Sequence, residues 1–129
     1  MTLHVELVSP EQILYSGDAD MVVCRTTDGE IAFLTGHAPF VGNLGIGPVK
    51  INEPGGEVER AAVHGGFVEV SHDNVTILSD VAELASQIDV ARAQRAAELA
   101  EAALRETHDA TCEAALRRAH VRIAVAELH

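Results

Sequence analysis

The sequence has 129 residues, of which 47% are hydrophobic and 22% are charged, and its net charge at pH 7 is −11. A chain of this length and composition can bury one hydrophobic core and carry an appendage. It contains no apolar run long enough to span a membrane, and its first six residues, MTLHVE, lack the basic start and apolar core of a signal peptide. We therefore expect a soluble intracellular protein that does not insert into a membrane.

The negative charge is distributed unevenly along the chain. Nearly all of the net charge belongs to residues 1–85, since acidic and basic side chains almost balance in residues 86–129. A strongly acidic domain repels phosphate backbones, so nucleic acid and anionic lipid are poor candidate partners. Solubility of a small domain is a second explanation of the same charge.

Residues 3–80 have the pattern of short strands separated by turns. Apolar and polar residues alternate in three places, around Leu3, Val5 and Leu7, around Val49 and Ile51, and around Val75 and Ile77. Asp28 and Gly29, between two apolar runs, predict a hairpin with a primed turn, and residues 54–56 and 72–74 predict two further turns. Because no helical pattern interrupts these strands, residues 1–85 are predicted to form an antiparallel β-sandwich.

From residue 86 the sequence becomes rich in alanine and arginine. Two alanine-rich segments, separated near residues 106–109, favour helices, and the short connection predicts an antiparallel two-helix hairpin over residues 86–129. A narrow apolar stripe on the second helix would consist of Cys112, Leu116, Ala119 and Ile123. Alanine offers little apolar surface, so weak docking on the sandwich is expected. A static appendage and a mobile element controlled by a ligand or partner both remain open.

The sequence contains no recognisable catalytic or metal-binding motif. No two of its seven histidines are spaced i, i+3 or i, i+4, and its two cysteines, Cys24 and Cys112, are far apart. It has no Gly-x-Ser-x-Gly elbow, and its glycine-rich residues 42–47 are not followed by the Lys-Ser or Lys-Thr of a phosphate-binding loop. We therefore expect a protein that is not an enzyme, holds no metal and requires no cofactor.

Residues 65–83, GGFVEVSHDNVTILSDVAE, closely resemble the signature of the epsilon subunit of bacterial F-type ATP synthase. Residues 29–31 and 36–39 resemble the same family, and the order of predicted elements agrees with it along essentially the whole chain. The resemblance implies a non-catalytic central-stalk (rotor) subunit that couples proton flow to ATP synthesis. It also implies a location on the cytoplasmic side of the cell membrane, with the sandwich bound to the gamma subunit and the ring of c subunits.

The resemblance further implies a regulatory role for the hairpin. In that family the hairpin either folds down on the sandwich or extends along gamma into the alpha/beta catalytic head, where it restrains ATP hydrolysis. By the same resemblance, Glu30 and His37 lie at the foot of the sandwich and contact the ring and gamma. A solvated hairpin turn at Glu30 and a histidine that fixes a loop at His37 explain these residues equally well.

Residues 88–93, IDVARA, look like the ATP-binding motif of the family, which is Ile or Leu, Asp, two variable residues, Arg and Ala. Asp89 could accept a hydrogen bond from an adenine amino group, and Arg92 could supply positive charge toward phosphates. ATP is thus expected as a regulatory ligand rather than a required cofactor. The candidate ATP-binding residues are Ile88, Asp89, Arg92 and Ala93, joined by Arg118 and Arg122 when the hairpin folds.

Each of these ATP-binding assignments has a structural alternative. Ser86 and Asp89 approximate a capping box at the start of the first helix, and Arg118 and Arg122 would form a solvated basic face. The function also has an alternative from another class, a free-standing ATP-binding sensor in which the sandwich is the scaffold and the hairpin is the lid.

Overall fold

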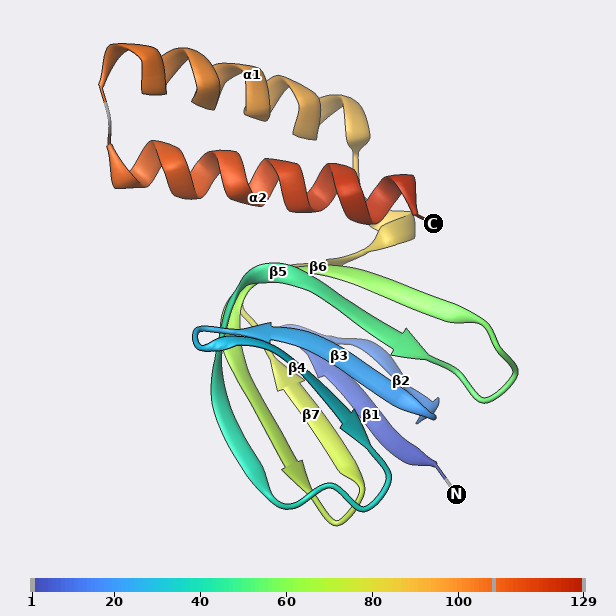
Figure 1. The fold of residues 1–129 in the computed structure, drawn as a ribbon. Helices are drawn as coiled ribbons and strands as arrows, with labels where there is room; N and C mark the ends of the chain where they lie inside the picture. Colours follow the sequence, from blue (N-terminus) through green and yellow to red (C-terminus); the bar gives the residue numbers. More distant parts are fainter. Residues whose placement is uncertain (1, 108, 129) are drawn as a thin grey trace.

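The computed structural model describes residues 2–107 and 109–128 (Figure 1). The N-terminal part consists of β1 (Leu3–Val8), β2 (Ile13–Ala19), β3 (Met21–Thr26), β4 (Gly29–Leu34), β5 (Phe40–Asn52), β6 (Val58–Ser71), β7 (Asn74–Leu78) and β8 (Ala82–Leu84). A 3-10 turn, η1 (Ala85–Gln87), then leads to the helices α1 (Val90–Glu106) and α2 (Ala110–Glu127). The predicted sandwich followed by a helical hairpin is therefore confirmed. In the described part of the chain, no helix is both long enough and apolar enough to cross a membrane.

The sandwich is one sheet that bends over on itself. Hydrogen bonds connect its strands in the order β2-β1-β7-β6-β5-β3-β4, and β8 pairs with the first half of β6. The two longest strands, β5 and β6, curve from one layer into the other (Figure 1). Their pairing is interrupted at Gly45, opposite Gly65, which is where the direction changes. Both layers therefore share β5 and β6 and enclose a single core.

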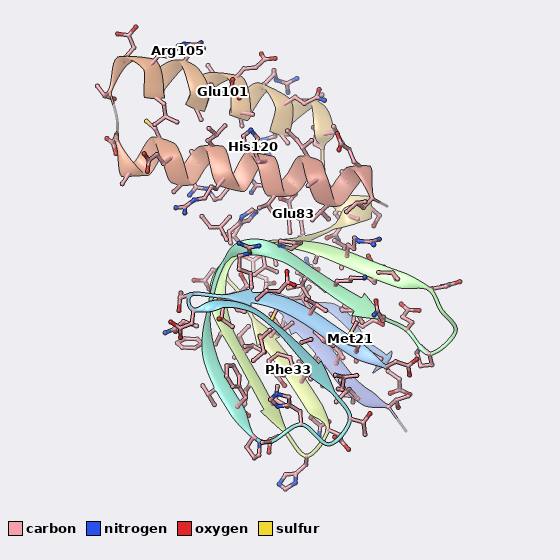
Figure 2. The ribbon with its side chains drawn as sticks, in the orientation of Figure 1. Met21, Phe33, Glu83, Glu101, Arg105 and His120 are labelled. Atoms are coloured by element: carbon pink, nitrogen blue, oxygen red, sulfur yellow. The ribbon has the colours of Figure 1, made fainter. Side chains whose placement is uncertain are left out.

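Alternate strand residues fill this core, as the apolar alternation predicted. Leu3, Val5 and Leu7 of β1 are fully buried, and Phe33 of β4 is the largest of the fully buried side chains (Figure 2). The remaining members of the buried cluster are Ala19, Val22, Cys24, Leu44, Val49, Ile51, Ala61, Val63, Val68, Val70, Val75 and Ile77. The branched side chains that favour strands thus also supply the packing.

The strand pairing differs from the prediction in one place. All pairs of neighbouring strands are antiparallel except β1 and β7, which are parallel and matched from His4 with Asn74 to Val8 with Leu78. Parallel neighbours cannot be joined by a tight turn. Here the chain reaches β7 only after passing through β2 to β6, which makes this pairing long-range.

The predicted primed turn was assigned to the wrong hairpin. Thr26 pairs with Gly29, so the turn between β3 and β4 is Thr27-Asp28, and Gly29 follows it with a φ of 128°. Both central residues of the β6–β7 turn have positive φ, 50° at His72 and 60° at Asp73. Positive φ at both positions defines the type I′ turn, whose twist matches that of the flanking strands.

Gly66 is required where β6 passes the end of β7. Its φ is 126°, and a Cβ atom at this position would overlap the carbonyl oxygen of Leu78. The neighbouring Ser79 is buried, and its hydroxyl lies 2.7 Å from the Gly65 carbonyl oxygen and 3.0 Å from that of Val81. This close contact between chain segments fixes the turn that leads into β8.

The two helices lie side by side in opposite directions, with α2 between α1 and the sandwich (Figure 1). The face of α1 that packs on α2 contains Ala93, Ala97 and Ala100, at helical spacing. Val125 and Val121 of α2 pack with Ala62, Ala85 and Ile88 in a small second cluster. The hairpin therefore docks through few apolar side chains, and on α2 these are Val121 and Val125 rather than the expected alanines.

The apolar stripe predicted for α2 was only partly correct. Of its members, Ala119 is buried, whereas Cys112, Leu116 and Ile123 are half-buried. The prediction missed Val125, which is 1% exposed and packs against the sandwich. The reason is that α2 packs on two sides, on α1 and on the sandwich, and a single helical stripe describes only one of them.

Candidate functional site

The joint between the sandwich and the hairpin is formed by β8, η1 and the first turn of α1. Asp89 is the N-cap of α1, with extended backbone angles, and its carboxylate accepts a hydrogen bond of 3.0 Å from the backbone N–H of Arg92. The helix thus begins at Val90, and the capping box predicted for Ser86 and Asp89 is wrong, since Ser86 lies in the preceding η1 turn. Asp89 itself satisfies a free N–H of the first turn.

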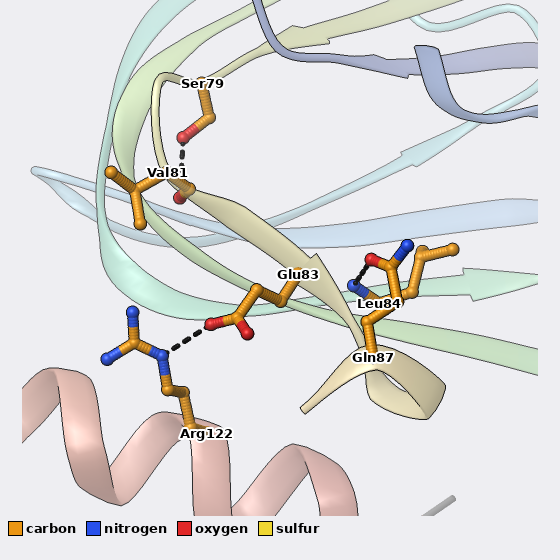
Figure 3. Close-up of polar contacts among 6 residues, drawn as sticks. All are labelled: Ser79, Val81, Glu83, Leu84, Gln87 and Arg122. Atoms are coloured by element: carbon orange, nitrogen blue, oxygen red, sulfur yellow. Dashed lines mark hydrogen bonds and ion pairs between the residues drawn. The ribbon is translucent and has the colours of Figure 1, made fainter. Parts of the chain in front are cut away.

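An ion pair crosses from the hairpin to the sandwich. The Nε of Arg122 on α2 donates to the carboxylate of Glu83 on β8 at 2.6 Å, and both side chains are partly buried (Figure 3). A second polar contact joins the two parts near the C-terminus, where the Arg60 guanidinium donates to the Leu128 carbonyl oxygen at 3.2 Å. Polar contacts therefore supplement the small apolar cluster under α2.

A cavity of about 470 Å³ lies at this joint. The hairpin lines it with Asp89, Arg92, Ala93, Ala96 and Arg122, and the sandwich contributes the rest of the lining: Ser9, Gln12, Leu14 and residues 80–83. This volume falls in the range of about 300 to 1,000 Å³ that is usual for small-molecule sites. The cavity spans both parts of the chain, so a molecule bound in it would contact the sandwich and the folded-down hairpin together.

The structure brings four of the six predicted ATP-binding residues to this cavity: Asp89, Arg92, Ala93 and Arg122. Ile88 instead packs against the small apolar cluster beneath α2. Arg118, one turn before Arg122, is half-buried and does not line the cavity. Three residues of the IDVARA motif, Asp89, Arg92 and Ala93, thus line the cavity.

The charges that line the cavity are mixed. Arg92 and Arg122 face it together with three acidic residues, Asp80, Glu83 and Asp89. The Glu83 carboxylate already neutralises Arg122, and one oxygen of Asp89 is used by the helix cap. Anion binding by the two arginines would therefore compete with carboxylates of the chain itself.

Sequence reasoning missed Asp80 and Glu83 as residues of this cavity. They belong to the end of the segment that carried the family resemblance, and no spacing relation connects them to Arg122, which is 39 residues later than Glu83. The available signal was the position of Glu83 just before the change in composition at residue 86. A residue at the end of the last strand must lie near the start of the hairpin.

The predicted partner-contact residues Glu30 and His37 lie near opposite ends of β4, which runs from Gly29 to Leu34. The expectation that both lie at the foot of the sandwich is therefore wrong, because an extended strand separates them. Glu30 pairs with Arg25 beside the β3–β4 turn. The ring of His37 packs edge-on against Phe33, with centroids 4.9 Å apart, and its Nδ1 lies 2.7 Å from the Ala38 carbonyl oxygen. The loop-fixing interpretation of His37 agrees with these contacts, and partner contacts at both residues stay a prediction.

A face of the sandwich carries exposed apolar side chains. Phe67 of β6 and Leu78 of β7 are directly paired and 54% and 48% exposed, and Val41 on the adjacent β5 is 69% exposed. A groove of about 460 Å³ lies beside Phe67 and Leu78, and Val8 and Pro10 also line it. Large apolar side chains gathered on adjacent strands are typical of a surface that another molecule covers.

Comparisons with known proteins agree with this architecture. Residues 2–85 match the beta-sandwich domain of the ATP synthase delta/epsilon chain, and residues 86–127 match the long alpha-helix domain of the same chain. The chain is 48% identical to the ATP synthase epsilon chain of Streptomyces griseus over 121 residues, which cover 94% of this chain and 92% of that protein. It is 45% identical to the epsilon chain of Halalkalibacterium halodurans over 130 residues, which cover 97% of each.

Two solved structures are similar in fold. A chain of the Euglena gracilis mitochondrial ATP synthase, in a structure of its OSCP, F1 and c-ring, matches 99% of this chain and 82% of its own length, with a TM-score of 0.82 and 25% identity. A chain from the central stalk and c-ring of the Tetrahymena thermophila enzyme matches 67% of this chain and 69% of its own, with a TM-score of 0.52 and 16% identity, and shows likeness of fold alone. From the two family matches and the relatives, the chain belongs to the family of the ATP synthase epsilon chain, a non-catalytic subunit of the central stalk.

Proposed function

We propose that this chain couples rotation to catalysis in an F-type ATP synthase, with its sandwich bound to the gamma subunit and to the c-subunit ring on the cytoplasmic side of the cell membrane. The observation that carries this proposal is the exposed apolar face of the sandwich, which Val41, Phe67 and Leu78 define. A face of this kind is costly to leave in water, and a central-stalk subunit has a constant partner to cover it. Proton flow would then drive the rotor without any reaction on this chain.

The groove beside Phe67 and Leu78 gives this face the shape of a receptor surface. Apolar side chains of gamma inserted there would be buried centrally, surrounded by polar residues of the same strands such as Glu69 and Thr76, which pair with each other across β6 and β7. Interfaces draw most of their affinity from a few central apolar residues of this kind. Glu30 and His37, at the two ends of β4, would add contacts outside this centre.

Binding to gamma can be tested with purified chains. Phe67→Glu should abolish association at micromolar concentration, because it places a charge at the centre of the face. Glu57→Gln, a change of an exposed residue in the β5–β6 turn, is the matched control and should bind like the unchanged chain. Failure of the unchanged chain to bind gamma at micromolar concentration would contradict the proposal.

We further propose that the hairpin is a brake on ATP hydrolysis and that ATP is its regulatory ligand. The thin docking surface of α2 supports a two-state hairpin, because a small apolar cluster, an ion pair and a hydrogen bond near the chain end are the main contacts that the described residues show between it and the sandwich. ATP bound in the cavity at the joint would contact both parts and favour the folded-down state. With the hairpin held down, it could not reach the alpha/beta catalytic head, and hydrolysis would be unrestrained.

The mixed charges of the cavity define how ATP would bind. Arg92 and Arg122 are the groups available for phosphates, and Arg122 must exchange its Glu83 partner for a phosphate oxygen. The acidic lining opposes a fully ionised triphosphate, so Mg²⁺, which neutralises part of that charge, should change the affinity. The free-standing sensor would use the same cavity, but membership in the epsilon family favours the stalk subunit.

The ATP proposal is tested by calorimetric titration of the isolated chain with ATP, with and without Mg²⁺. Arg92→Ala should abolish binding, whereas Arg95→Ala, an exposed arginine on the same helix that does not line the cavity, is the matched control. Asp89→Asn should keep the helix cap, since asparagine caps as well as aspartate, and so isolates the role of the carboxylate in binding. No binding at millimolar ATP would reject the ligand and leave gamma contacts as the means of regulation.

A further inference from the structure

His64 occupies an unusual position between the sandwich and the hairpin. On β6, Ala61 and Val63 point into the main core, so Ala62 and His64 point to the opposite side. Ala62 packs beneath Val125 and Val121 of α2. His64 follows it along the same side of the strand, and its environment includes Arg122 and Arg118, about one and two turns nearer the start of α2 than Val125.

Both ring nitrogens of His64 are shielded from solvent, and neither has a hydrogen-bond partner among the residues that the structure describes. Each ring nitrogen of a histidine is a donor or an acceptor, so this arrangement leaves an ordinary imidazole unsatisfied. Protonation makes both nitrogens donors and adds a charge, which increases the cost of leaving them without partners. The neutral ring is therefore the form that the docked hairpin tolerates.

The charged groups around His64 add to this preference. Arg118 and Arg122 approach from α2, Glu83 approaches from β8, and Asp80 lines the same groove as His64. Opposite His64, β5 supplies the apolar Ile46. The nearest compensating acid, Glu83, is already bound to Arg122 at 2.6 Å. Burial first, and then the charge of Arg122, lower the pKa of His64 to about 4, with Glu83 opposing the shift and Arg118 adding to it.

We propose that His64 makes docking of the hairpin sensitive to pH, so that acidification releases the hairpin from the sandwich. The released hairpin would leave the imidazole in water, where a proton is accommodated, whereas the docked hairpin would exclude that proton. This inference rests on the proposal that the hairpin leaves the sandwich, but it is independent of ATP.

The direction and size of the effect follow from linkage. The pKa of His64 is lower with the hairpin docked than the ordinary 6.5 of a solvated histidine, so docking is strongest above pH 6.5 and is lost as the pH falls toward 4. With these two values, the ratio of docked to released chains should fall about tenfold between pH 7.5 and pH 5.5.

Thiol labelling of the full chain without nucleotide measures this ratio. Val125→Cys places a thiol that is buried by docking, and Cys112→Ser removes the half-buried natural thiol. Cys24 should stay silent, because it is fully buried and burial raises its pKa to about 11. The labelling rate at each pH, divided by the rate of the same chain in denaturant, gives the protection that docking provides.

In the chain that carries Val125→Cys and Cys112→Ser, protection should fall about tenfold between pH 7.5 and pH 5.5. When His64→Gln is added to this chain, protection should remain constant over the same pH range. His72→Gln, which changes an exposed-loop histidine in the β6–β7 turn, is the matched control and should keep the tenfold change. The inference would be overturned if the labelled chain that retains His64 were protected equally at both pH values. It would also be overturned if the tenfold change persisted in the chain with His64→Gln.

A second measurement covers the case in which His64→Gln does not dock. An NMR titration of the His64 ring in the chain with no substitution should give a midpoint well below pH 6.5. Titration of the His64 ring near pH 6.5 would overturn the inference, because the docked hairpin would then accept the proton without cost. Loss of ATP binding affects neither measurement, so failure of the ATP proposal and failure of this inference are distinguishable.

Discussion

The sandwich and the hairpin are stabilised by different kinds of side chain. The core of the sandwich consists mostly of branched side chains packed around Phe33, and it includes the fully buried Leu7 and Ile77. The hairpin packs α1 on α2 through Ala93, Ala97 and Ala100, and docks on the sandwich through the small cluster around Val125. Because burial contributes roughly 25 cal/mol per Å² of apolar surface, the sandwich is a stable body, whereas hairpin docking depends on a small surface.

This difference suits the function proposed above, in which the subunit transmits force and the hairpin regulates hydrolysis. A rotor part must keep its shape, which the large core provides, while a brake must change position at a cost that one ligand or partner can supply. The joint between them contains the polar groups that such a change would use, namely Glu83, Asp89 and Arg122. Substitutions in the two regions should therefore have separable effects.

The largest expected effect is in the sandwich. Phe33→Ala removes a fully buried aromatic ring and should lower the free energy of unfolding by about 3 to 5 kcal/mol, through lost burial and the resulting cavity. Urea denaturation followed by circular dichroism in the β-sheet region measures this loss. Leu99→Ala, at a position on α1 that is 73% exposed, is the control and should change stability by less than about 0.5 kcal/mol. A small effect of Phe33→Ala would mean that the core is not the stable part.

A smaller and more local effect is expected at the docking cluster. Val125→Ala removes two methyl groups from a side chain that is 1% exposed, which should weaken docking by about 1.6 kcal/mol and leave the unfolding of the sandwich unchanged. NMR contacts between α2 and the methyl group of Ala62 would report docking. Val90→Ala, the same chemical change at an exposed position of α1, should leave those contacts intact. Equal destabilisation of both regions would show that they unfold as one unit.

Much of the sandwich could be predicted from the sequence, because strand alternation directly encodes which side chains face the core. Leu3, Val5 and Leu7 were assigned correctly for this reason. The turn types were harder, since Asp28-Gly29 and His72-Asp73 both contain residues that tolerate positive φ, and the strand register decides which of them adopts it. The parallel pairing of β1 with β7 is a long-range contact and has no local signal.

The candidate site was predicted less completely, for a physical reason. The resemblance of residues 88–93 to the family's ATP-binding motif identified Asp89 and Arg92, but the cavity also needs residues that only the docking of the hairpin brings near. Glu83 and His64 were missed because their surroundings come from α2, far along the chain. The motif therefore predicts the residues that the start of α1 contributes to the cavity. The docked position of the hairpin determines which other residues line it.

The smallest expected effect concerns the ion pair that links the two regions. Glu83→Gln, Arg122→Gln and the double substitution form a cycle, whose coupling energy isolates the pair from other contacts of each side chain. The side chains are 31% and 26% exposed, so solvent screens them, and we expect a coupling of about 0.2 to 1 kcal/mol that decreases with salt. Protection of the Val125→Cys thiol measures docking in each variant. Zero coupling would mean that apolar contacts alone hold the hairpin down, whereas several kcal/mol would mean that the pair is desolvated and is itself the main latch.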